Sequence, residues 1–189
     1  MLEDAKTRKS KMFFVDAAHF VHGSYLGYLW CFVRCFIKSP SGRNRFNVLG
    51  ALDAITKEII TIVNESYINA ESVCALLEEI AKRNVGIPIT LVMDNARYQK
   101  CNLVKLAAER LHIELVFLPS YSPNLNLIER YWKFVKKKCL YSKYYESFSL
   151  FKNAIEAVLK NEKSKYDEEL NRLLTLNFQT FKNVKIVTV

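Results

Sequence analysis

The chain has 189 residues, of which 50% are hydrophobic, and it carries a formal net charge of +9. That length suits about one domain, and the hydrophobic share with only 5 glycines and 4 prolines excludes a disordered chain. The positive charge favours a polyanionic partner. The longest apolar passage, residues 25–37, is interrupted by Arg34 and is too short to cross a bilayer.

The five cysteines are an odd number and are scattered through apolar stretches. Such a distribution fits a reducing cytosol better than a framework of disulfides, so the sequence predicts a cytoplasmic protein. Zinc binding is an alternative role for one group of side chains, although their order and spacing match no standard zinc finger: His19, His22, Cys31 and Cys35.

The first predicted strand follows a polar N-terminal segment, residues 1–10. It covers residues 11–15, is apolar on both faces, and ends at Asp16. Residues 20–38 are rich in aromatic side chains and form either a further strand or a packing loop. Residues 39–45 form a basic, turn-rich connector.

An antiparallel hairpin and a helix are predicted next. The hairpin pairs residues 46–53 with residues 58–64, whose apolar side chains supply core contacts. The helix begins at Asn69 or Glu71 and runs to about Asn84, with Gly86 as its stop signal.

The second half of the chain alternates strands and helices. A buried strand over residues 89–93 ends at Asp94, a helix covers about residues 98–111, and a strand covers residues 114–118. A proline-containing turn then leads to another helix, for which Asn126 is the predicted N-cap. The buried stripe of that helix is predicted to contain Ile128, Trp132, Val135 and Cys139, and a neighbouring face to contain Glu129, Lys133, Lys136 and Leu140.

The character of the sequence changes at Glu146, where apolar residues at helical spacing alternate with charged stretches. Two further helices are predicted, and the ending, residues 182–189, is β-prone. The order of elements predicts an α/β fold of the ribonuclease H-like kind, a mixed five-stranded sheet flanked by helices, with a helical C-terminal tail. The predicted divisions are a polar segment, residues 1–10, a catalytic domain, residues 11–145, and a helical extension of the same domain, residues 146–189.

Three acids have the pattern of a metal site: Asp16, Asp94 and Glu129. Thirty-four residues (95–128) separate the second from the third. Carboxylates from an early strand, a central strand and a later helix can together hold two divalent cations, which clamp the attacking and leaving oxygens of a phosphodiester. Each acid also has a purely structural interpretation. Asp16 is a turn former, Asp94 caps the next helix, and Glu129 forms a capping box with Asn126.

Around these acids the chain resembles the DDE transposases of the Tc/mariner superfamily, in particular the bacterial insertion-sequence branch. The resemblance rests on the blocks VDAAHF, VMDNAR and LPSYSPNLNLIERYW and on the spacing of 34, which that branch shows. It runs from about Lys11 to Leu140. Two positions depart from the family pattern, because Gln99 stands where the family often has His and Leu127 where it often has Pro.

The resemblance implies that Asp16, Asp94 and Glu129 are catalytic metal ligands for two Mg²⁺ or Mn²⁺ ions in a ribonuclease H-like fold. It implies metal-dependent DNA strand cleavage and strand transfer, with transposon ends and target DNA as partners and a homodimer on DNA. No membrane and no small-molecule cofactor are expected, and the cytoplasmic protein would associate with the bacterial nucleoid.

Basic residues near the acids are candidates for phosphate contacts. Residues 17–52 and 130–145 contain no acid at all, and a basic run is as often a solvated face as a DNA-binding one. The predicted DNA-binding residues are Arg34, Arg43, Arg45, Arg97, Lys100, Lys133, Lys136 and Lys137.

Members of this family normally carry an N-terminal helix-turn-helix region, whereas only about ten polar residues precede the first strand here. The chain is therefore expected to be a fragment, the downstream product of a split reading frame, or a remnant. Three alternatives to an active transposase are a different ribonuclease H-like nuclease, a catalytically inactive DNA-binding or assembly protein, and a basic structural protein with chance motifs.

Overall fold

A computed structural model describes residues 2–23, 31–34, 36, 44–119, 122–160 and 162–178. Its centre is a five-stranded sheet in the order β3-β2-β1-β4-β5. The strands are β1 (Lys11–Val21), β2 (Arg45–Asp53), β3 (Ile59–Asn64), β4 (Ile89–Met93) and β5 (Ile113–Phe117). β1, β2 and β3 are antiparallel neighbours, whereas β4 is parallel to both β1 and β5. This is the mixed sheet that the sequence predicts.

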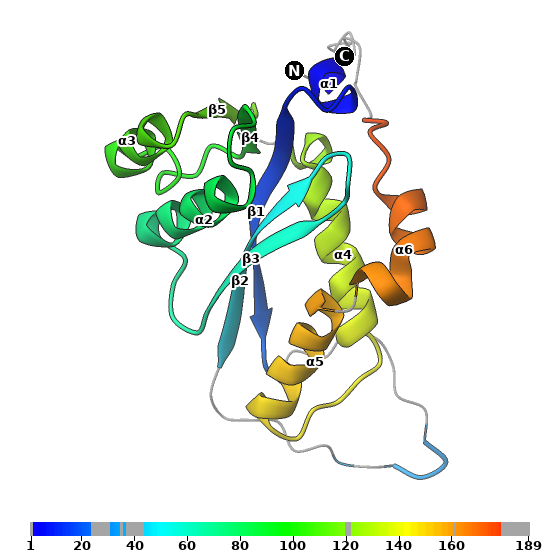
Figure 1. The fold of residues 1–189 in the computed structure, drawn as a ribbon. Coiled ribbons are helices and arrows are strands. Elements are labelled where there is room, and N and C mark those ends of the chain that lie inside the picture. Colours follow the sequence, from blue (N-terminus) through cyan, green and yellow to red (C-terminus); the bar gives the residue numbers. More distant parts are fainter. Residues whose placement is uncertain are drawn as a thin grey trace, which may run out of the picture.

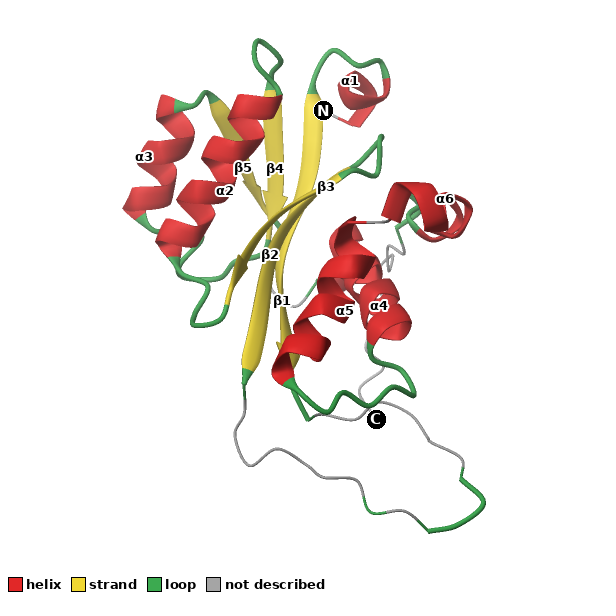
Figure 2. Ribbon diagram, turned by 60° about the horizontal axis from the view of Figure 1, so that its bottom comes forward, coloured by secondary structure: helices red, strands yellow, loops and turns green. Residues whose placement is uncertain are grey.

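Helices cover both faces of the sheet (Figure 1). They are α1 (Leu2–Lys6), α2 (Ala70–Arg83), α3 (Asn102–Arg110), α4 (Leu127–Cys139), α5 (Phe148–Lys160) and α6 (Glu162–Leu173). Figure 2 shows α2 and α3 on one face and α4 and α5 on the other. Within the described residues, no helix is long and apolar enough to cross a membrane.

The two faces of β1 belong to two separate hydrophobic cores. Phe13 and Val15 pack in the core under α2 and α3, whereas Phe14 and Ala18 pack in the core under α4 and α5. Because side chains alternate between the two faces of a strand, Asp16 shares the face of Phe14 and Ala18. The acid therefore points toward the layer that contains α4.

β1 is longer than the sequence predicts, so Asp16 does not end this strand. β2 pairs with β1 as far as Val21, whereas β4 pairs only with residues 11–14 of β1. The antiparallel partner therefore extends the strand through the acid. Asp16 lies just beyond the last parallel pair, beside the end of β4.

The hairpin, α2, β4 and β5 agree with their predictions to within one or two residues. Asn69 caps α2 by accepting a hydrogen bond from the Ser72 backbone N–H at 3.0 Å. α3 begins at Asn102 rather than near residue 98, because the backbone N–H groups of Gln99 and Lys100 both donate to the Ala96 carbonyl and form a separate turn. The prediction of a helix over residues 98–101 is therefore wrong.

The C-terminal part of the chain is helical, as predicted. Phe151, Ile155 and Val158 of α5 are buried in the same core as α4. The divisions at residues 10 and 145 stay predictions. The β-prone ending, residues 182–189, and most of the aromatic segment, including Trp30, lie outside the described residues.

Gly50 lies directly opposite Asp16 on β2, under the ring of Trp132. A Cβ atom at this position would lie 2.8 Å from two Trp132 ring carbons and 3.1 Å from Cδ1 of Ile128. Real Cβ contacts are not that short, so only glycine lets α4 approach the sheet this closely.

Gly50→Ala is expected to lower the free energy of unfolding by about 1–3 kcal/mol, because the added methyl group overlaps a packed ring. Urea denaturation measures the loss. In a Trp132→Leu background the same change should cost less, since the clash is relieved. An equal cost in both backgrounds would show that the ring is not the obstacle.

Candidate active site

Asp16 lies in the middle of β1, between the N-terminal part of α4 and the end of β4. It is partly buried, and the Ala17 backbone N–H interacts with its carboxylate. The indole N–H of Trp132 also faces this carboxylate, although it falls short of a full hydrogen bond. The residue is therefore held by the strand on one side and by α4 on the other.

Asn126 connects the start of α4 to β1. Its Nδ2 donates to the carbonyl oxygen of Val15, the residue before Asp16, at 3.2 Å. Asn126 occupies the N-cap position as predicted, but within the described residues its side chain makes no capping hydrogen bond. The capping-box interpretation of Glu129 is therefore wrong. Glu129 is nevertheless the third helical residue, and its backbone N–H donates to the Asn126 carbonyl at 3.2 Å.

Asp94 directly follows β4, and its Oδ1 accepts the Ala96 backbone N–H at 3.1 Å. The N-cap of α3 is Cys101, so Asp94 does not cap that helix. The turn is anchored to the chain after β5, because the Asn95 amide donates to the Leu118 carbonyl. A second bond joins the Leu118 N–H to the Met93 carbonyl at 2.8 Å.

The three acids influence one another electrostatically. The pKa of Asp16 is raised to about 7, mainly by burial and then by the negative charges of Glu129 and Asp94, against the opposing effects of Ala17 and Trp132. Burial also raises the pKa of Tyr98 to about 12, with smaller contributions from Asp94 and Asp16. The sheet and α4 therefore bring the three predicted acids into one region.

The acids are spread out rather than tightly gathered. Among the residues that the structure describes, no three His, Cys, Asp or Glu side chains are already close enough together to hold a single ion. Carboxylate oxygens are nevertheless the donors that Mg²⁺ and Mn²⁺ prefer. The donor set fits hard divalent cations.

Several residues at this site were not assigned to it by sequence reasoning. Trp132 was predicted only as part of a buried stripe, and Gly50 was not singled out, because its role depends on strand register. Gln99, which departs from the family pattern, is fully buried beside Tyr98, and its Nε2 lies 3.5 Å from the Tyr98 hydroxyl oxygen. Leu140, predicted to lie on the face of Glu129, is instead buried at the end of α4.

The predicted DNA-binding residues fall into two groups near the acids and a third group elsewhere. Arg97 and Lys100 are exposed in the turn that follows Asp94. Lys133 and Lys137 are exposed on α4, one and two turns after Glu129. Lys136 is partly buried, with its ammonium nitrogen 6.0 Å from the centre of the Phe20 ring.

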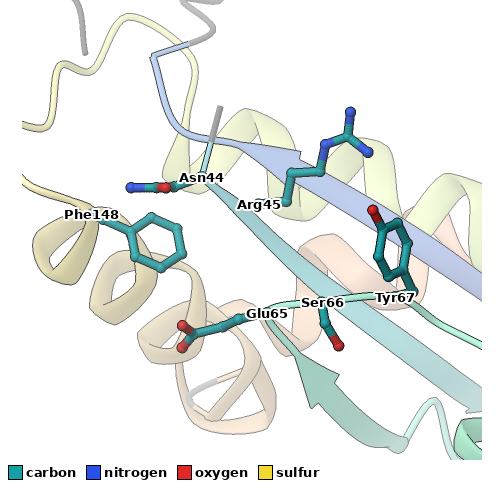
Figure 3. A pocket seen from close by; sticks show the side chains of 6 residues that line it. All are labelled: Asn44, Arg45, Glu65, Ser66, Tyr67 and Phe148. Carbon is teal, nitrogen blue, oxygen red and sulfur yellow. The ribbon is translucent and has the colours of Figure 1, made fainter. Parts of the chain in front are cut away.

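Arg45 lies farther along the sheet, because it pairs with Val21, which is five residues beyond Asp16 on β1. Five residues of a strand span roughly 17 Å. It lines a pocket of about 500 Å³ with Asn44, Glu65, Ser66, Tyr67 and Phe148 (Figure 3). None of the three acids lines this pocket. Arg34 is exposed, its guanidinium 5.3 Å from the Phe36 ring centre, and Arg43 lies outside the described residues.

Two other cations of the acid-free run in α4 bind the C-terminal part of the chain. Arg130 donates to the carbonyl oxygens of Thr175 and Asn177 at 2.8 and 2.7 Å. Lys138 forms an ion pair with Glu169 of α6 at 2.6 Å. These two residues contribute to folding, whereas Lys133 and Lys137 present their charge to solvent.

Residues 11–152 match the family model described as DDE superfamily endonuclease, which is most of the chain. The chain belongs to this family. The matched range contains Asp16, Asp94 and Glu129 and every strand of the sheet. No curated protein sequence matches this chain.

Solved structures share the fold of this DDE superfamily endonuclease. The Mos1 strand transfer complex has a TM-score of 0.62 at 14% identity, covering 88% of this chain and 50% of the Mos1 chain. The Mos1 catalytic domain with raltegravir and Mn has a TM-score of 0.62 at 13% identity, and the match covers 92% of this chain and 81% of the Mos1 chain. An intasome of simian T-cell lymphotropic virus has a TM-score of 0.57 at 14% identity, and the match covers 94% of this chain and 59% of the viral chain. The ribonuclease H-like fold is confirmed, and the chain spans about half the length of the Mos1 chain in the strand transfer complex.

The electrostatic environment of Asp16 predicts how stability depends on pH. Its pKa is about 7 in the folded protein, above the ordinary value of 3.8, so between these values the folded state binds the proton more tightly. The stabilisation by that proton is fully present below about pH 4 and is lost as the pH rises through 7. When a chelator removes divalent cations, the free energy of unfolding should therefore fall between about pH 4 and pH 7 more steeply for the natural chain than for Asp16→Asn. Parallel profiles from urea denaturation at a series of pH values would contradict this.

Proposed function

We propose that this chain is the catalytic domain of a DNA transposase, in which Asp16, Asp94 and Glu129 hold the divalent cations for strand cleavage and strand transfer. One observation carries the proposal. The three acids that form a trio in the sequence lie in one region of the fold, on β1, directly after β4 and in the first turn of α4, and the other two carboxylates contribute to the raised pKa of Asp16.

The acids suit two cations, Mg²⁺ or Mn²⁺, better than one. Both of the other carboxylates contribute to the raised pKa of Asp16. Asp16 is therefore the ligand that both ions would share, with Asp94 and Glu129 each completing one of the two sites. When bound, the cations lower the pKa of a water molecule or 3′-hydroxyl and stabilise charge on the attacking and leaving oxygens. Two of the solved structures with this fold are described with Mn.

The chain supplies a rigid frame for this chemistry. Asp16 is part of a long strand, Glu129 is in the first turn of a helix tied to that strand, and Asp94 accepts a hydrogen bond within its own turn. Ligands on regular elements keep their positions better than ligands on loops. With a pKa of about 12, Tyr98 stays protonated at neutral pH and does not serve as a nucleophile.

DNA would lie across the two groups of exposed cations. Arg97 and Lys100 follow Asp94 in its turn, and Lys133 and Lys137 follow Glu129 along α4, so a phosphate backbone that contacts both groups would pass over the carboxylates. These contacts are independent of base sequence and contribute affinity rather than specificity. The partners we propose are transposon ends and target DNA, with two copies of the chain on the DNA, as the paired-end complexes of Mos1 suggest.

The spacing of 34 residues and the block LPSYSPNLNLIERYW support assignment to the bacterial insertion-sequence branch, and hence to a cytoplasmic protein at the nucleoid. The scattered free cysteines Cys31, Cys74, Cys101 and Cys139 agree with a reducing compartment.

Activity is tested by nicking of supercoiled plasmid in Mn²⁺. The natural chain should nick the plasmid, and Asp94→Asn or Glu129→Gln should reduce the rate by roughly 100-fold or more, because each cation contributes several kcal/mol to the transition state. Glu114→Gln, an acid of β5 that hydrogen-bonds Thr90, is the matched control and should keep its rate. Nicking by Asp94→Asn at the natural rate would exclude the acid from the site. Absence of nicking by the natural chain would contradict the proposed activity.

DNA binding is tested by its dependence on salt. Replacing Lys133 and Lys137 with Ala should weaken binding to all sequences and make the slope of log affinity against log salt shallower, by roughly 0.9 for each lost phosphate contact. Electrophoretic or anisotropy titrations at several salt concentrations give the slope. The control is the double change Lys82→Ala and Lys105→Ala, which removes two exposed lysines from the α2–α3 face. An equal effect in both double variants would show that only net charge matters.

A further inference from the structure

Trp132 carries one of the buried polar atoms that find no hydrogen-bond partner among the described residues. Its indole Nε1 is buried and finds no hydrogen-bond acceptor in bonding geometry among the described residues. A buried donor left without a partner costs free energy, so an unpaired indole N–H calls for a reason. The carboxylate that this N–H faces is that of Asp16.

The ring of Trp132 is held in one orientation. It lies over Gly50, the cross-strand partner of Asp16, so closely that a Cβ atom there would be 2.8 Å from its carbons. On its other side the Tyr131 ring packs edge to face, with centroids 5.3 Å apart. Only 2% of Trp132 is exposed, so the indole has no room to turn its N–H toward solvent.

We propose that Trp132 is a positioning residue for the metal site, its indole N–H donating to one carboxylate oxygen of Asp16 and leaving the other oxygen for the cations. This inference rests on the proposed function, because it takes Asp16 to be a metal ligand. A hydrogen bond from an N–H to an ionised carboxylate is roughly twice as strong as one between neutral groups.

The proposed contact explains why the chain combines a glycine on β2 with the largest side chain on α4. A smaller aromatic residue could fill the space above the sheet, but only the indole carries an N–H into it. Partners of this kind orient metal ligands, and their loss typically lowers metal affinity by about 10–100-fold.

The decisive variant is Trp132→Phe, which keeps an aromatic ring over Gly50 and removes the donor. Manganese binding is followed by the electron paramagnetic resonance signal of free Mn²⁺, which needs no DNA and no activity. We expect the Mn²⁺ affinity of Trp132→Phe to fall by about 10-fold or more. Phe134→Leu is the matched control, because Phe134 is equally buried on the same helix and packs against Tyr166. It should lower stability and leave Mn²⁺ affinity unchanged.

A second variant keeps the indole and moves it. Gly50→Ala displaces the Trp132 ring without changing any carboxylate, and it should also weaken Mn²⁺ binding. In a Trp30→Phe protein, Trp132 is the sole tryptophan of the chain, so Mn²⁺ should quench its fluorescence, and Asp16→Asn should abolish the quenching.

The outcomes separate the two claims. Mn²⁺ binding by the natural chain with unchanged affinity in both Trp132→Phe and Gly50→Ala overturns the positioning role and leaves the proposed function intact. Failure of the natural chain to bind Mn²⁺ overturns both. Equal losses of affinity in Trp132→Phe and Phe134→Leu would show that Trp132 acts through packing alone.

Discussion

The close packing of α4 against the middle of β1 and β2 is the contact on which the site depends. Gly50 lets the helix approach, Trp132 fills the resulting space, and Asn126 binds the Val15 carbonyl at the helix start. These three contacts bring Glu129 into the region of Asp16, where its charge contributes to the raised pKa of that acid. The same helix contributes to the main hydrophobic core with α5, so the geometry of the site is maintained by the stability of the domain.

This arrangement has an electrostatic cost. Three carboxylates share a partly buried region, and burial together with mutual repulsion raises the pKa of Asp16 to about 7. Divalent cations would reverse the balance, because they replace repulsion between acids by attraction to a shared charge. Two basic residues of α4 do not neutralise the acids in this way, since Arg130 binds backbone carbonyls and Lys138 pairs with Glu169.

Local patterns in the sequence predicted most of the elements. The helix that begins after Asn126 and the buried stripe of that helix could both be predicted because each depends on residues near in sequence. The length of β1 could not, because pairing with β2 extends it beyond Asp16. The role of Gly50 could not either, since it requires the strand register and the helix position together. The capping box failed because Asn126 binds β1 instead of its own helix.

The roles of the basic residues of α4 also could not be predicted from local sequence patterns. Lys133, Lys137 and Arg130 are alike in sequence, yet only the contacts of the C-terminal segment reveal that Arg130 serves the fold. The distinction depends on residues 45 and 47 positions away, which no local pattern contains. The charged run therefore combines a solvent-exposed part, Lys133 and Lys137, with a structural part.

The most direct test of the account is the anomalous diffraction of Mn²⁺ in crystals of the protein. If the three acids hold both cations, two Mn²⁺ peaks should appear about 4 Å apart, with Asp16 between them and Asp94 and Glu129 as the outer ligands. Ordered Mn²⁺ bound by other residues, with these three acids free of metal, would contradict it.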